Sequence, residues 1–261
     1  MRKILLTTVG VTALAVSANA TDFTLSGTSK ILIADDGNTS VSNTINVGVS
    51  KTFDNGMVLS LSQNMNADST EMTITSDAVS VTFGDFDQNE KAPGLNGNAA
   101  ASDINSDGIA HGTDTATSGS ISLGATVAGV GIGAAMNNEG DTMFGGSFST
   151  DMGGMAVTIG GDVYSDNTSS ADQTTIGVKA TIGALAVVAH SKQVEAAAGT
   201  DTVSYSAAYT AGGLVIGFQG DDADASSYSA TYTVVPGMQF EIGSSDDGTT
   251  STSSAELQMT F

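Results

Sequence analysis

The sequence predicts an all-β protein, a transmembrane antiparallel β-barrel of about 16 strands. Three observations predict this fold. Apolar and polar residues alternate with a period of two along most of the chain, which is the pattern of strands with one apolar face. The connections between these runs are alternately short and long, as in outer-membrane barrels. After residue 20, no continuous apolar run is long enough for a membrane-spanning helix.

The first 20 residues have the features of a secretory signal peptide. Arg2 and Lys3 precede the apolar run "ILLTTVGVTALAV", and "ANA" at 18–20 is a small-x-small cleavage signature. We therefore expect residues 1–20 to direct export and residues 21–261 to form one barrel domain. A transmembrane helix is the alternative for this segment, but about 13 apolar residues are short for a bilayer.

Composition narrows the class of protein. Without the leader, five lysines and no arginine face all 28 acidic residues, a formal charge of −23. This charge repels nucleic acid and attracts cations. The chain has no cysteine, so no disulfide stabilises it, and its 32 glycines and two prolines suit a fold with many tight turns.

Sixteen alternating runs follow the leader in order. They lie at 23–33, 45–53, 57–65, 72–74, 79–83, 121–127, 130–136, 144–150, 155–163, 176–182, 185–189, 203–209, 214–218, 228–234, 238–242 and 255–261. Short turns at 54–56, 76–77, 128–129, 151–154, 183–184, 211–213 and 235–237 alternate with longer polar loops, of which 84–119 is by far the longest. We assign the short turns to the periplasmic rim and the longer loops to the outer rim.

The apolar face is expected to point outward into lipid. The other face of nearly every run carries Ser, Thr, Gly, Asn, Gln, Asp or Glu, and large apolar residues are too few to fill a separate core. A sheet of this kind is stable when it closes on itself in hydrocarbon, because closure satisfies every backbone group. The last run alternates up to Phe261, so we expect it to pair with the run that begins near Asp22. A soluble secreted β-protein is the alternative.

Together, the leader, the strand "VSVTFGDFD" before the longest loop and the terminal "LQMTF" resemble the general porins of Gram-negative bacteria, of the alphaproteobacterial type. The resemblance covers the whole chain after the leader. It implies a 16-stranded barrel, a homotrimer, a third outer loop that folds inward and constricts the pore, and a terminal Phe261 that is read by the barrel-assembly machinery. General porins usually carry an arginine cluster opposite the acidic loop, and this chain lacks one.

Strand parity assigns the charged residues to faces. On the pore wall we expect Glu71, Asp162, Glu241 and Glu256 with Lys30 and Lys179; Lys51 falls on the lipid or subunit face, and Lys91 and Lys192 in loops. If the long loop folds inward as in porins, the constriction is lined by Asp85, Asp87, Glu90, Asp103, Asp107 and Asp114. Rings of carboxylates select cations. The expected function is a water-filled, cation-preferring outer-membrane channel for ions and small hydrophilic solutes.

Other chemistry has less support in the sequence. His111 lies in the long loop and His190 faces the lumen by parity, and no G-x-S-x-G elbow is present; we expect no enzyme, the alternative being an outer-membrane barrel phospholipase or protease. The acidic stretches 103–108 and 220–226 could hold structural Ca²⁺, but neither has the terminal Glu of an EF-hand. We expect no other cofactor. A barrel that serves only as a surface anchor is a third alternative.

Overall fold

The computed structural model describes residues 21–66, 69–87, 118–167, 172–195 and 201–261. They form 16 strands: β1 (Thr21–Ala34), β2 (Thr39–Thr52), β3 (Val58–Asn64), β4 (Ser69–Thr75), β5 (Val79–Asp87), β6 (Ser118–Val127), β7 (Val130–Asn137), β8 (Thr142–Asp151), β9 (Met155–Ser165), β10 (Asp172–Ile182), β11 (Leu185–Glu195), β12 (Thr202–Ala211), β13 (Leu214–Asp221), β14 (Ser226–Val235), β15 (Met238–Asp246) and β16 (Ser251–Thr260). No helix in these ranges is long and apolar enough to span a membrane.

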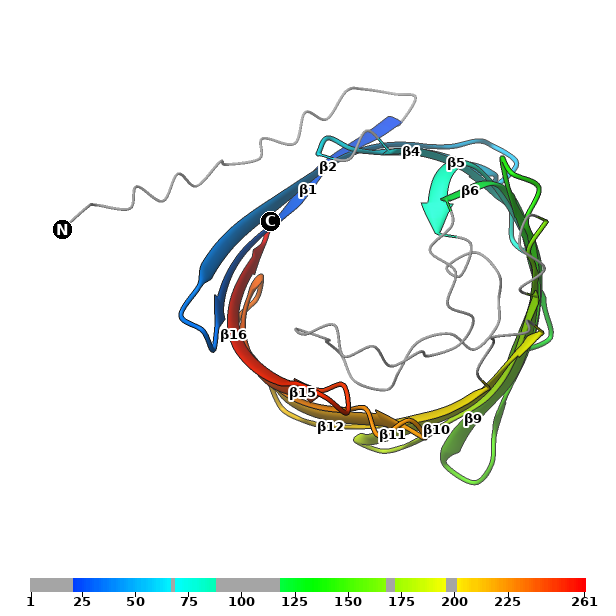
Figure 1. Ribbon diagram of the computed structural model, residues 1–261. Coiled ribbons are helices and arrows are strands. Elements are labelled where there is room, and N and C mark those ends of the chain that lie inside the picture. Colours follow the sequence, from blue (N-terminus) through cyan, green and yellow to red (C-terminus); the bar gives the residue numbers. More distant parts are fainter. Residues whose placement is uncertain (1–20, 67–68, 88–117, 168–171, 196–200) are drawn as a thin grey trace.

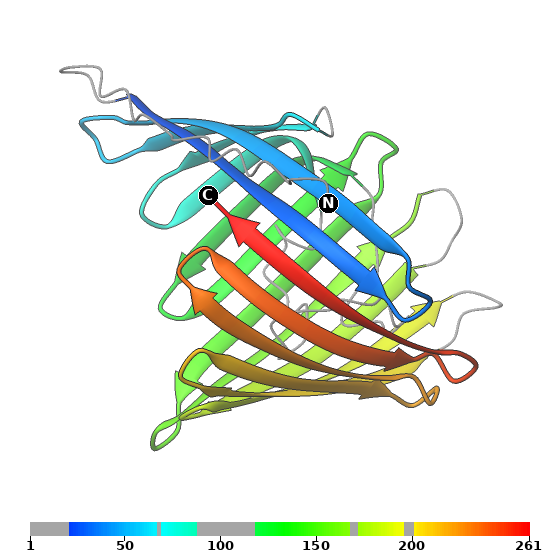
Figure 2. The ribbon, with the colours of Figure 1, turned by 90° about the vertical axis from the view of Figure 1, so that its left-hand side faces the viewer.

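The strands form a single closed sheet. Each strand pairs antiparallel with its sequence neighbours, and β1 pairs with β16 to complete the ring (Figure 1). The predicted all-β fold with 16 antiparallel strands in a closed barrel is therefore confirmed. Seen from the side, the strands are strongly tilted (Figure 2), as closure of a twisted sheet requires.

Local sequence explains the tight turns between the strands. Ala128 and Gly129, the two residues between β6 and β7, both have positive φ, 53° and 82°. A two-residue type I′ hairpin needs this conformation at both central positions. Similar short connections join β2 to β3, β4 to β5, β8 to β9 and the later pairs, so all the predicted short turns lie at one end of the barrel.

Several strands are longer than the apolar alternation predicted. β2 begins at Thr39 rather than near residue 45, and β11 continues to Glu195 rather than ending at residue 189. These extensions consist mainly of Ser, Thr, Asn, Gln and Lys. Backbone pairing continues where both faces are polar, so the apolar pattern marks only part of each strand. The prediction that Lys192 lies in a loop was wrong for this reason.

The seam between the two ends of the sheet is staggered. Thr28 is opposite Thr260, and each residue from Thr21 to Gly27 is in register with β2. Figure 2 shows β1, in blue, running well past the end of β16, in red. β1 therefore extends six residues beyond the level at which the chain ends.

Candidate pore lumen

The two faces of the barrel wall differ in chemistry. Along β7, exposed and buried residues alternate strictly, with Val130 and Ile132 on the outward face. The same alternation continues round the ring, so large apolar side chains point outward. The lumen face carries the buried polar set, which includes Thr82, Ser122, Asn137, Asp162, Thr175, His190, Ser204, Ser206, Gln219, Thr231, Glu241, Ser245 and Glu256. The interior of the ring is thus lined by polar and ionisable groups.

The predicted wall carboxylates all lie on the lumen face. Asp162, Glu241 and Glu256 are 3%, 2% and 8% exposed. Glu71 is partly buried, and its Oε1 accepts a hydrogen bond from Thr73 Oγ1 at 3.1 Å. Glu241 and Glu256 are directly opposite each other across β15 and β16, which places two like charges side by side on the wall.

The lysines are distributed on both faces. Lys30 lies on the lumen face, where its Nζ is 3.1 Å from Glu256 Oε1. Lys179, on β10, also lies on the lumen face, directly opposite the buried Val188 on β11. Lys51 lies on the outward face with its Nζ 5.5 Å from the centroid of the Phe53 ring. Lys91 lies outside the described residues.

Lys192 corrects the sequence assignment. It is in register with Thr175 on β10 and Thr202 on β12, and it shares the lumen face with His190 two residues earlier. The wall therefore carries three of the chain's lysines, Lys30, Lys179 and Lys192, against the four predicted wall carboxylates. Strand alternation would have placed Lys192 on the lumen face if the predicted strand had been continued through the polar residues after position 189.

The end of β5 leads into the segment predicted to constrict the pore. Gly84 has a φ of 115°, and a side chain there would collide with the Thr70 carbonyl oxygen. The register shifts between Phe83 and Phe86, and Figure 1 shows the strand end bending from the wall into the ring. A bulge at this glycine thus redirects the chain toward the lumen.

The predicted constriction residues are only partly visible. Asp85 is exposed in the bulged stretch, and the backbone of Asp87 ends β5. Four further predicted acids lie outside the described residues: Glu90, Asp103, Asp107 and Asp114. His111 lies outside them as well.

An apolar cluster on the lumen face was missed by the sequence analysis. Phe86, Ala135, Met143 and Tyr164 pack together and are buried. Met143 and Tyr164 are directly opposite each other on β8 and β9. Strand alternation could have identified Met143 and Tyr164, because both are apolar residues at positions that face the lumen, where most other residues are polar.

His190 and Ser204 are neighbours across β11 and β12. Activation of a serine by histidine requires a hydrogen bond between them. Ser204 Oγ is buried and makes no hydrogen bond to any described group. The two residues are therefore not arranged as a nucleophile and its base.

The acidic turn after β13 uses its carboxylates locally. Asp221 Oδ1 accepts hydrogen bonds from the amides of Ala223 and Ala225, both at 2.9 Å, and Asp222 Oδ1 accepts one from the Val203 amide at 3.0 Å. Among the described residues, no three acidic, histidine or cysteine side chains are grouped as metal ligands. The other candidate calcium segment, 103–108, lies outside the described ranges.

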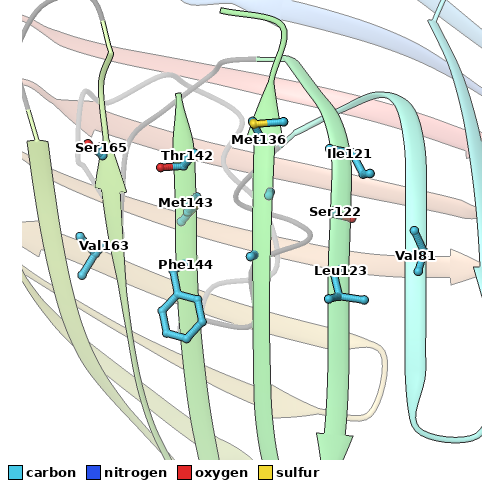
Figure 3. A pocket seen from close by; sticks show the side chains of 12 residues that line it. Val81, Ile121, Ser122, Leu123, Met136, Thr142, Met143, Phe144, Val163 and Ser165 are labelled. Atoms are coloured by element: carbon cyan, nitrogen blue, oxygen red, sulfur yellow. The ribbon is translucent and has the colours of Figure 1, made fainter. Parts of the chain in front are cut away.

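A hollow of about 510 Å³ lies over β5 to β9 (Figure 3). Its lining is largely apolar, and Leu123, Ala134, Phe144 and Val163 form one row of paired residues along it. These four residues have the outward parity of the wall. The hollow is thus a groove in the apolar surface, and the described residues that line it include no carboxylate, histidine or lysine.

Comparison with known proteins identifies the fold. No family model matches the chain, and no curated protein matches it. Among solved structures, an engineered variant of Rh. blastica porin matches with a TM-score of 0.65 and 14% identity, covering 92% of this chain and all of that one. A second variant gives 0.62 and 15%, with the same coverage, and a triple mutant of Rhodopseudomonas blastica porin gives 0.63 and 14%. The chain therefore has the fold of a general porin of the alphaproteobacterial type.

Proposed function

We propose that the protein is an outer-membrane porin that forms a water-filled, cation-preferring diffusion channel for ions and small hydrophilic solutes. One observation carries this proposal: the barrel is closed, with its apolar residues outside and its ionisable residues inside. A soluble barrel would have the opposite arrangement, because its interior would be packed with apolar side chains.

The outward face supports a membrane environment. Val127, Ile176 and Phe144 are 65%, 63% and 60% exposed, and many other large apolar side chains surround them. A continuous apolar surface of this extent is rare on soluble monomers. Most strands have 8 to 11 residues, and tilted strands of about 9–11 residues span a bilayer.

The remaining features follow from the same proposal. Residues 1–20 act as the export signal, the short turns face the periplasm, and Phe261 is read by the barrel-assembly machinery. The protein is not an enzyme. It forms a homotrimer, and we assign the contact face to β1 and β2, because Ser29 and Asn43 form a polar cross-strand pair on the outward face there. Polar groups are costly in hydrocarbon, and a neighbouring subunit covers them.

The cation preference comes mainly from the end of β5 and the segment that follows it. Among the described residues, the four predicted wall carboxylates share the lumen face with Lys30, Lys179 and Lys192, and Lys30 is paired with Glu256. The charges of these seven residues are therefore almost balanced. Asp85, Asp87, Glu90, Asp103, Asp107 and Asp114 supply the negative potential if this segment constricts the lumen, with Lys91 as the cation among them.

Planar-bilayer recording with a KCl gradient tests the proposal. We expect stepwise conductance and a reversal potential of cation sign, which shrinks as salt rises because the Debye length falls to about 3 Å at 1 M. Combined Asp85→Asn, Asp87→Asn and Glu90→Gln should reduce the reversal potential. Asp221→Asn with Asp222→Asn is the matched control, since both carboxylates bind backbone amides at the rim.

Three results would contradict parts of this proposal. Absence of conductance from folded protein would favour an anchor or a secreted β-protein. A reversal potential of zero or of anion sign in dilute salt would remove the cation preference. Equal effects of the two sets of substitutions would remove the constriction from the segment after β5.

A further inference from the structure

Among the described residues, three of the buried side-chain acceptor atoms that lack a hydrogen bond lie on neighbouring strands of the lumen wall. They are both carboxylate oxygens of Asp162 and the Oε1 atom of Gln173. The Asp162 side chain is 3% exposed. Buried polar atoms are nearly always hydrogen-bonded, and a buried charge without a partner is costly. A cationic hydrogen-bond donor would satisfy these acceptor atoms.

The three atoms belong to one patch of the wall. Asp162 is opposite Thr175, and Tyr164 is opposite Gln173, across β9 and β10. Asp162 and Gln173 are therefore diagonal neighbours on the lumen face, with Cα atoms roughly 7–8 Å apart. Lys192 lies in the same row beyond Thr175, but among the described residues it forms no ion pair with Asp162.

The surroundings of the patch differ on its two sides. Toward the long-loop end, Tyr164, Met143 and Phe86 form the buried apolar cluster. On the other side, Gly145 is opposite Asp162, and Gly160 is opposite Gly177 in the next lumen row. The carboxylate is thus bordered by apolar side chains in one direction and by bare backbone in the other.

We infer that this patch binds a primary alkylammonium ion. Such an ion has three N–H donors, which matches the three acceptor atoms, and its alkyl chain would lie beside the apolar cluster of Phe86, Met143 and Tyr164 next to the carboxylate. An inorganic cation would use the oxygens but gain nothing from the apolar cluster. The inference deepens the proposed channel function and rests on it, because it names a class of cation that the pore recognises.

Equilibrium binding of n-butylammonium tests this site without requiring conduction. The probe is titrated against the folded, detergent-solubilised barrel, and saturation-transfer difference NMR gives its dissociation constant. We expect Asp162→Asn to weaken binding about tenfold or more, because a charge-assisted hydrogen bond is lost, and Gln173→Leu to weaken it several-fold. Glu241→Gln, a buried lumen carboxylate on another part of the wall, should change it less than about twofold.

Tetramethylammonium provides the second arm, because it carries the same charge and has no N–H donor. It should bind about tenfold more weakly than n-butylammonium. Equal affinity for the two ions, or equal loss of affinity from Asp162→Asn and Glu241→Gln, would overturn the inference. Heat-modifiable migration on gels confirms that each variant is folded.

Conductance separates this inference from the proposed function. In planar bilayers, n-butylammonium should reduce potassium current through the wild type and have a much smaller effect on Asp162→Asn. A conducting pore that neither binds nor responds to n-butylammonium would overturn the inference and leave the channel function intact. A barrel that binds the ion but conducts nothing would overturn the channel function instead.

Discussion

Phe261 and Gly27 hold each other through two backbone hydrogen bonds across the seam of the barrel. The Phe261 amide donates to the Gly27 carbonyl at 3.0 Å, and the Gly27 amide donates to the Phe261 carbonyl at 2.9 Å. The Phe261 ring lies against Gly27, so that a side chain at position 27 would meet the ring. The last residue of the chain is thus a paired member of the wall.

Removal of Phe261 should lower the yield of folded barrel several-fold, because both hydrogen bonds and the ring contact are lost, together with the proposed assembly signal. The measurement is the fraction of heat-modifiable protein in outer membranes. Gly27→Ala keeps the terminal phenylalanine, but its added methyl group disturbs the contact between the Phe261 ring and residue 27. Reduced yields for both variants indicate a role in the seam, and loss for the deletion alone indicates recognition by the assembly machinery. Wild-type yield for the deletion would exclude both roles.

Lys30→Met should destabilise the folded barrel by about 1–2 kcal/mol, less than for a fully buried ion pair because the lysine side chain is 42% exposed. The substitution removes the cation that is paired with Glu256, which lies directly opposite Glu241. Adding Glu241→Gln should recover part of the loss, since it removes the like-charge contact. Urea unfolding in lipid vesicles measures both effects. A Glu241→Gln change that adds further destabilisation would contradict this reading of the three charges.

Lys192→Gln should increase the cation preference of the pore. The substitution removes one of the three wall lysines, and the lumen-facing carboxylates then exceed the lysines by a wider margin. The reversal potential in a dilute KCl gradient is the measurement, and Lys51→Gln is the control because Lys51 lies outside on the Phe53 ring. Identical reversal potentials for the wild type and Lys192→Gln would show that position 192 does not sense the permeating ion.

Orientation in the membrane can be tested with single cysteines, because the chain has none of its own. Asn55→Cys and Pro236→Cys place thiols in exposed short turns, and Asp222→Cys places one in an exposed turn at the opposite end. A membrane-impermeant maleimide added to intact cells should label only position 222. Labelling at 55 and 236 alone would reverse the assignment of the two rims.

Asp247→Asn should reduce stability near neutral pH. Amides of Thr250 and Thr249 donate to Asp247 Oδ1 at 2.7 and 2.8 Å in the turn between β15 and β16, and these bonds hold the pKa of Asp247 below its usual 3.8. A lowered pKa stabilises the fold at pH values above the unfolded pKa, and this contribution is lost as pH falls through the folded value. Urea midpoints of wild type and variant should converge below about pH 4; a constant difference would contradict the mechanism.

The sequence predicted the strands and their closure because a barrel wall with lipid on one face and water on the other requires apolar and polar residues to alternate with a period of two. It predicted strand ends less well. Around Lys192 and Thr39, both faces of the strand are polar. Apolar and polar residues therefore do not alternate there, although backbone pairing with the neighbouring strand continues. Apolar residues on the polar face were also missed: Met143 and Tyr164 contact each other across strands, and only the paired register brings them together with Phe86. The unbonded oxygens of Asp162 likewise depend on three-dimensional neighbours.

The uneven seam fixes how deep the barrel sits in the bilayer. Before Gly27, β1 pairs with no described residue on its β16 side, so the backbone groups of Phe23 and Leu25 that point that way bond to no described strand. Hydrocarbon does not tolerate such groups, and water does. In the proposed orientation, with the short turns in the periplasm, we therefore expect the pairing of Gly27 with Phe261 to mark the inner boundary of the hydrocarbon layer and the first six residues of β1 to lie in water beneath it.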